Sequence, residues 1–190
     1  MNMKLRLSTL VLVAGGLFCI ASINARAADG TITIQGSVSD TTCSINGAAS
    51  GTPADISVTL PTVQAGSLAS AGAVAGTSNM GDIQMVLSGC SGAATKAVAR
   101  FENGSTVDQS SGYLKNTAGT NGAQNVQVRL LNASMQPINI VTGQNNDVAS
   151  NGTAITGGSA VLKYFAQYFA TGKAEAGNVS TSVQYTMQYQ

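Results

Sequence analysis

Apolar and polar residues alternate with a period of two along much of the chain. The alternation is clearest in residues 31–35, 82–87, 124–131, 163–170 and 182–189. A period of two is typical of a β-strand that buries one face. The residues that share one face of the last segment are Val183, Tyr185, Met187 and Tyr189. No window of the sequence carries a sustained helical stripe, so the pattern predicts an all-β chain.

Clusters of glycine, asparagine and serine separate the alternating segments. They are Asn46-Gly47, Ser91-Gly92, Asn103-Gly104, Asn121-Gly122, Asn151-Gly152 and Gly157-Gly158. Asparagine and glycine tolerate the positive φ angles of tight turns. Many short strands joined by such turns are typical of an antiparallel β-sandwich.

The first 27 residues have the pattern of a cleaved secretory signal peptide. Lys4 and Arg6 precede an apolar run from Leu7 to Ile23, and Ala25-Arg26-Ala27 has the form of a cleavage site. The alternative, a transmembrane anchor, is less favoured because the run is short and ends at a processing sequence. We therefore expect export, with residues 28–190 as one mature domain.

Charge and composition argue against a nucleic-acid partner. Charged residues make up 9% of the chain, compared with about 25% in ordinary globular domains. Residues 28–190 carry six basic against eight acidic side chains, a net charge of −2. Without a basic patch there is nothing to neutralise phosphates. A weakly charged surface rich in threonine and valine fits β-structure exposed outside the cell.

Two cysteines, Cys43 and Cys90, remain after the predicted signal peptide. An even number of cysteines in an exported chain indicates a disulfide. The long loop that it closes predicts a stabilisation of about 4 kcal/mol. A metal or redox pair would need further ligands or a closer spacing, and the sequence offers neither.

The residues of common catalytic sites are largely missing. The chain has no histidine, which removes the usual general base, metal ligand and serine–histidine pair. A serine–lysine dyad with Lys96 or Lys163 is formally open, but both residues fit solvated surface lysines better. Asp147, beside Asn145 and Asn146, fits a polar turn better than a calcium loop. We expect no enzyme, no metal and no cofactor.

The segment after the signal peptide alternates continuously. Its apolar side comprises Gly30, Ile32, Ile34, Gly36 and Val38, because alternate residues of an extended strand share a face. An ordinary first strand of the chain's own sandwich would account for this pattern equally well.

Several further motifs occur in a fixed order. They are the Gly30–Val38 opening, Cys43, Val58-x-Leu60-Pro61, Leu87-x-Gly89-Cys90, Asn125–Val128, Tyr168–Gly172, Gly177 as fourteenth residue from the end and Tyr189 as the penultimate one. In this order and spacing the whole chain resembles the pilin subunits of type 1-like chaperone–usher fimbriae. The resemblance implies an incomplete immunoglobulin-like antiparallel β-sandwich that lacks its last strand. The groove so left would be completed by a donor strand from another subunit.

The resemblance also assigns roles along the chain. Residues 28–41 would be the donor-strand segment and residues 42–190 the pilin β-sandwich domain. The residues that would enter a neighbour's groove are Gly30, Ile32, Ile34, Gly36 and Val38. The strand that captures the chaperone and walls the groove would contain Gly177, Val183, Tyr185, Met187 and Tyr189. The implied partners are neighbouring pilin subunits, a periplasmic pilus chaperone and an outer-membrane usher, and the implied destination is the fimbrium. The alternative function is a secreted single-domain carbohydrate-binding module, which the absence of tryptophan disfavours.

Overall fold

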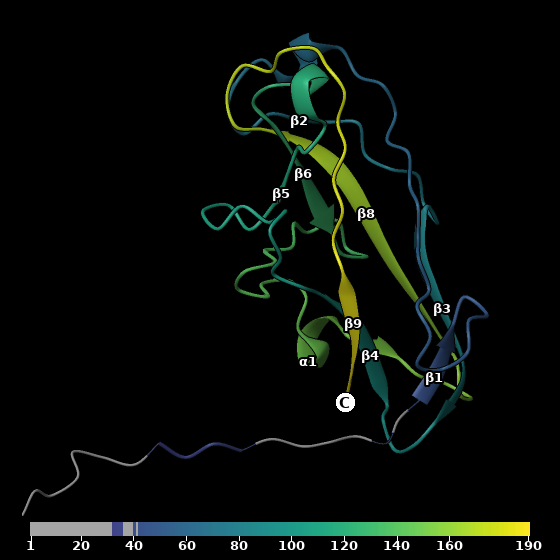
Figure 1. Ribbon diagram of the computed structural model, residues 1–190. Helices are drawn as coiled ribbons and strands as arrows, with labels where there is room; N and C mark the ends of the chain where they lie inside the picture. Colours follow the sequence, from purple (N-terminus) through teal and green to yellow (C-terminus); the bar gives the residue numbers. More distant parts are fainter. Residues whose placement is uncertain (1–31, 36–39, 41) are drawn as a thin grey trace, which may run out of the picture. The chain divides into compact units, whose positions relative to one another are not determined.

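The computed structural model of the chain describes residues 32–35, 40 and 42–190 (Figure 1). The chain divides into two compact units, Met1–Gly36 and Ser37–Gln190, and the fold is that of the second unit. The predicted signal peptide, residues 1–27, lies outside the described residues. Within the described part of the chain, no helix is long and apolar enough to cross a membrane.

The larger of two sheets is built around one long strand. Its strands, in spatial order, are β1 (Thr42–Ile45), β3 (Ile83–Ser91), β8 (Ala160–Ala170), β6 (Val126–Leu131) and β5 (Leu114–Lys115), and β2 (Val74–Ala75) also pairs with β8. All of these pairings are antiparallel. Strand β8 pairs with β3 along its first half and with β2 and β6 along its second half. It therefore organises the whole sheet (Figure 1).

The smaller sheet has the order β7 (Thr153–Ala154), β4 (Lys96–Phe101) and β9 (Tyr185–Tyr189). The helical pieces are short: η1 (Ala65–Leu68), η2 (Gly119–Asn121) and α1 (Val148–Asn151). The expectation of an all-β antiparallel fold is thus confirmed. The predicted polar turn is present at Gln144 and Asn145. Asp147 follows it, and its carboxylate accepts a hydrogen bond from the N–H of Ser150 at 2.7 Å and caps α1. A short polar side chain that binds an otherwise unpaired N–H is what starts a helix.

The hydrophobic core lies between the two sheets. Its fully buried side chains include Met85, Leu87, Val98 and Leu162. The alternating burial along β3 and along the first part of β8, residues 160–164, follows from the period-two pattern of the sequence, because successive side chains of a strand point to opposite faces. Phe101 of the smaller sheet meets Tyr164 of the larger one edge to face, with ring centroids 5.1 Å apart.

A tight hairpin follows β1. Ile45 and Ala48 form an antiparallel bridge, and the two residues between them, Asn46 and Gly47, have φ angles of 49° and 81°. Two positive φ angles in a two-residue hairpin are the geometry for which Asn-Gly is preferred. The predicted turn at this position is confirmed.

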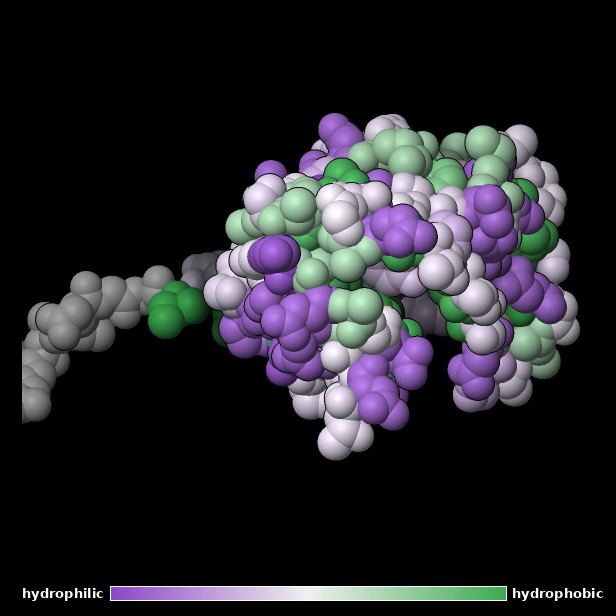
Figure 2. All heavy atoms as spheres, turned by 90° about the horizontal axis from the view of Figure 1, so that it is seen from above, coloured by the Kyte–Doolittle hydropathy of each residue, from purple (hydrophilic) through white to green (hydrophobic). Residues whose placement is uncertain are grey.

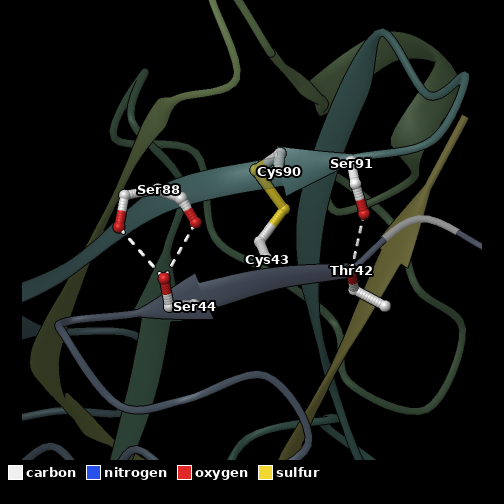
Figure 3. Close-up of a disulfide and its surroundings, with 6 residues drawn as sticks. All are labelled: Thr42, Cys43, Ser44, Ser88, Cys90 and Ser91. Carbon is white, nitrogen blue, oxygen red and sulfur yellow. Dashed lines mark hydrogen bonds between the residues drawn. A yellow bond between two sulfur atoms is a disulfide. The ribbon is translucent and has the colours of Figure 1, made fainter.

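The disulfide joins Cys43 of β1 to Cys90 of β3 (Figure 3), as the sequence predicts. Thr42 pairs with Ser91 and Ser44 with Ser88, so β3 has one extra residue between these pairs. Gly89, at φ 60°, lies in this bulge. Bulges of this kind use a glycine at positive φ, and here the extra residue brings Cys90 rather than Gly89 against Cys43. Hydroxyl hydrogen bonds flank the disulfide on both sides: Thr42 with Ser91 at 2.8 Å and Ser44 with the Ser88 carbonyl at 2.9 Å.

Candidate functional site

An open groove of about 1260 Å³ runs along the sandwich in the second unit. Two chain segments border it: residues 53–60, called the first rim, and residues 179–189, called the second rim. In Figure 1 the second rim is the yellow strand that runs down to the C-terminus, and the first rim is part of the blue-to-teal chain at the right. Seen from above, the surface is hollowed between two lobes at the lower edge of Figure 2.

The first rim is an extended segment whose side chains alternate. The half-buried residues that face the groove are Ala54, Ile56, Val58 and Leu60, and the exposed ones between them are Asp55, Ser57 and Thr59. The backbone of residues 53–60 makes no hydrogen bond to the backbone of any other described residue. An unpaired extended segment of this kind is a free sheet edge.

Among the described residues, the second rim makes backbone hydrogen bonds along one edge only. The N–H of Glu102 donates to the Gln184 carbonyl at 2.8 Å, and Lys96 and Gln190 exchange backbone hydrogen bonds at the other end. In an antiparallel ladder, hydrogen-bonded pairs alternate with pairs that make no such bonds. The odd-numbered residues between 183 and 189 therefore direct their N–H and C=O groups away from β4. These groups form a second free edge, which faces the groove.

The groove is apolar because the same odd-numbered residues direct their side chains into it. Val183, Tyr185, Met187 and Tyr189 all line the groove, together with core residues of the larger sheet such as Met85 and Leu130. The structure thus brings together four of the five residues assigned to the groove strand by resemblance. One polar atom stands out: the buried hydroxyl oxygen of Thr181 has no hydrogen-bond partner among the described residues.

The tyrosine hydroxyls of the groove keep their protons at neutral pH. Burial raises the pKa of Tyr168 and Tyr189 above the usual value. Burial also raises the pKa of Tyr185, and the negative charge of Asp55 adds to this effect. The hydroxyl of Tyr185 donates a hydrogen bond of 2.6 Å to the Ala54 carbonyl on the opposite rim.

The fifth residue, Gly177, lies apart from the groove lining. It is exposed, and a Cβ at this position would overlap the backbone N of Ala123. The chain needs glycine here because the segment passes close to the backbone of Gly122 and Ala123. Glycine is therefore required at this position by the close approach of two backbone segments, and not by the groove.

Four of the five predicted donor residues fall in the N-terminal unit, and Val38 falls at the start of the second. Gly30, Gly36 and Val38 lie outside the described residues. Ile32 and Ile34 are described, and each exposes 89% of its surface. Two large apolar side chains that are this exposed and lie two residues apart form an apolar stripe, and such a stripe is typical of a binding surface.

Sequence reasoning missed most of the first rim. The sequence pattern identifies Val58 and Leu60 only as part of a family motif. It does not identify Ala54 and Ile56 as groove residues. The signal was nevertheless present, since residues 54–60 alternate with the period of two that marks the other strands. Tyr168 and Thr181 were also not identified as groove residues.

A sandwich with an apolar groove between two unpaired backbone edges defines a class of protein, the incomplete immunoglobulin-like sandwich whose last strand is missing. The sequence model of the family described as FimA, type-1 fimbrial protein A, matches residues 60–190. The chain belongs to this family of chaperone–usher fimbrial pilins.

Similar proteins agree with this assignment. The chain is 42% identical to the major fimbrial subunit SMF-1 of Stenotrophomonas maltophilia, over 91% of this chain and 99% of that protein. It is 41% identical to the F17 fimbrial protein of Escherichia coli, over 92% of this chain and 96% of that protein. The fold is also that of a Burkholderia pseudomallei antigen and type I fimbria protein, with a TM-score of 0.53 at 22% identity, over 80% of this chain and 97% of that one.

The chain is therefore a structural subunit of a surface fimbria, with neighbouring pilin subunits as its partners. The family is one of structural proteins, and the carbohydrate-binding alternative is not favoured.

Proposed function

We propose that the groove receives residues 28–41 of a neighbouring subunit as its missing strand, so that subunits polymerise by donor-strand exchange. One observation carries the proposal: an apolar groove with two free backbone edges occurs in the same chain as two isoleucines exposed by 89% each. The groove lacks a strand, and the N-terminal segment carries the alternating pattern of one.

The pattern of the donor segment suits the groove. Gly30, Ile32, Ile34, Gly36 and Val38 would enter it, while the polar residues between them would face solvent. In β-strand addition, main-chain hydrogen bonds to the sheet edges supply affinity and alternate side chains fill pockets. Burial of the three larger side chains contributes roughly 1.5–3 kcal/mol each, and each ladder hydrogen bond adds about 0.5–1.5 kcal/mol.

The open groove also needs to be covered by a partner protein before the subunits assemble. An open apolar groove with unpaired edges is an aggregation hazard. We infer that a periplasmic pilus chaperone covers it after residues 1–27 have directed export, and that an outer-membrane usher guides the exchange of chaperone for donor segment. The donor and chaperone roles of the named residues need no metal or cofactor.

A synthetic peptide of residues 28–41 tests the proposal directly. Added to chaperone-free subunit refolded from denaturant, it should raise the melting temperature, because a ligand that binds only the folded state stabilises it. A peptide with Ile32→Asp and Ile34→Asp should have no effect, whereas one with Thr33→Ser should act like the original.

Deletion of residues 28–35 provides the matching test in cells. The shortened subunit should fold and bind chaperone, but should not insert into another subunit's groove. Normal fibres from this variant, or no stabilisation by the unaltered peptide, would show that Ile32 and Ile34 serve another purpose.

A further inference from the structure

One hydrogen bond crosses the groove. The hydroxyl of Tyr185 on the second rim donates to the carbonyl of Ala54 on the first rim at 2.6 Å. Among the described residues, this is the only hydrogen bond between residues 53–60 and the second rim. Since the first rim has no backbone ladder of its own, the bond to Tyr185 is its one hydrogen-bonded attachment to the opposite side.

The groove remains open while this bond is made. Tyr185 and Ala54 both line the cavity of about 1260 Å³, and the lining extends beyond them on each rim, to Leu60 and to Tyr189. The phenol therefore spans the groove without sealing it. A bond that closed the groove would have to break before a strand entered, whereas a bond that spans an open groove holds the two edges at a set position.

We propose that Tyr185 is a positioning residue for strand insertion, which holds the first rim in register with the second through Ala54 while the groove is empty. This inference rests on the proposed function, because it assigns the groove a strand as its occupant. Once a donor strand is in place, its own ladder hydrogen bonds fix the first rim, and the bond from Tyr185 becomes redundant.

The consequence is kinetic. A binding site that is already ordered avoids the entropy cost of ordering at the moment of binding. Loss of the Tyr185 hydroxyl should therefore slow association of the donor segment and leave its dissociation unchanged. A tyrosine hydroxyl keeps its donor proton at neutral pH, and burial and the charge of Asp55 raise the pKa of Tyr185 further.

Tyr185→Phe is the test, because it removes the hydroxyl and keeps the ring. Tyr113→Phe is the control: Tyr113 lies outside the groove lining, and its hydroxyl makes no hydrogen bond to a described residue. Association and dissociation of a fluorescent peptide of residues 28–41 would be followed on the refolded, chaperone-free exported protein. Backbone ¹⁵N order parameters of residues 55–59 would be measured on the same samples without peptide.

We expect Tyr185→Phe to lower the association rate roughly two- to tenfold, the factor that corresponds to one hydrogen bond. It should also lower the order parameters of the first rim, with dissociation unchanged, and Tyr113→Phe should behave like the wild type. An unchanged association rate for Tyr185→Phe, or a change confined to dissociation, would overturn the positioning role. A wild-type protein that does not bind the peptide would instead overturn the proposed function.

Discussion

The backbone of Ala99 is held by two side chains, and one of them is Tyr164 of the opposite sheet. The N–H of Ala99 donates to the Tyr164 hydroxyl at 2.9 Å, and Asn146 donates to the Ala99 carbonyl at 2.9 Å. Strand β7 pairs with β4 only at Lys96 and Ala97, so Ala99 lies just past the end of that pairing. The two side chains take the place of the missing strand.

Tyr164→Phe should destabilise the fold, because it leaves the buried N–H of Ala99 without an acceptor. We expect a loss of about 1–3 kcal/mol in the free energy of unfolding, measured by chemical denaturation. Tyr113→Phe is the control, since the Tyr113 hydroxyl makes no hydrogen bond to a described residue. Equal stability of the two variants would contradict this role for Tyr164.

The alkaline limit of stability should also depend on Tyr164. Burial raises the pKa of Tyr164 to about 12, from 10.0. Between these values the unfolded chain releases the phenol proton and the folded chain keeps it, so stability present below pH 10 is lost as the pH rises towards 12. The free energy of unfolding should fall by roughly 2 kcal/mol over this range, and the fall should be smaller in Tyr164→Phe.

The disulfide between Cys43 and Cys90 should be formed in all molecules of the exported protein. Mass spectrometry under non-reducing conditions should find no free thiol at Cys43 or Cys90, and two free thiols would contradict the pairing. Replacement of both cysteines by alanine should lower the free energy of unfolding by about 4 kcal/mol, because the bond closes a long loop between positions 47 apart. Ser91→Ala, which removes only the hydroxyl contact to Thr42, should cost far less.

The second rim should govern chaperone capture. Tyr189→Ala removes a groove-lining side chain, so we expect less chaperone to co-purify and the subunit to be degraded in the periplasm. Gln188→Ala, on the same strand but outside the groove lining, should be captured normally. Normal capture of Tyr189→Ala would show that this wall of the groove is dispensable.

Gly177 should matter for folding of the isolated subunit rather than for the groove. Gly177→Ala forces a Cβ into the backbone of Ala123, and we expect a loss of about 1–3 kcal/mol in stability from overpacking. Gly104→Ala is the control, because a Cβ at that position meets nothing within 4 Å. A stable Gly177→Ala protein that fails only in chaperone binding would instead support the role assigned by resemblance.

Substitutions in the donor segment should separate two causes of failed insertion. Ile34→Asp would place an unpaired carboxylate in an apolar groove at a cost of several kcal/mol, whereas Gly36→Leu would fail by steric overlap. Both variants should fold and bind chaperone but be absent from fibres in electron micrographs, while Thr33→Ser should assemble. Incorporation of Ile34→Asp into fibres would contradict insertion of this residue.

Much of the fold follows from sequence because period-two alternation and turn chemistry are local. The segments at 82–87, 124–131 and 163–170 became β3, β6 and β8, and the Asn46-Gly47 turn has the predicted geometry. Strand β9 starts at Tyr185, although the alternation starts at residue 182. The residues before 185 make few backbone hydrogen bonds to β4, and a strand is defined by such bonds.

The rest depends on contacts between distant segments. The first rim carries the alternation of a strand but has no partner, so neither its role nor the Tyr185 bond to Ala54 could be read from a local pattern. The need for glycine at 177 arises from the backbone of Ala123, more than 50 residues away. The bulge at Gly89 could not be predicted, since it shows only when β1 and β3 are set side by side.

The groove and the exposed isoleucines belong to different parts of one chain, and this fixes the symmetry of any assembly that they form. A contact between two unlike surfaces is heterologous: it need not close into a two-fold dimer, and it can repeat head to tail without limit. A fibre built in this way is polar. One end presents an empty groove and the other an unused N-terminal segment, so each end adds a subunit through a different surface. A subunit that lacked either feature would terminate growth at one end.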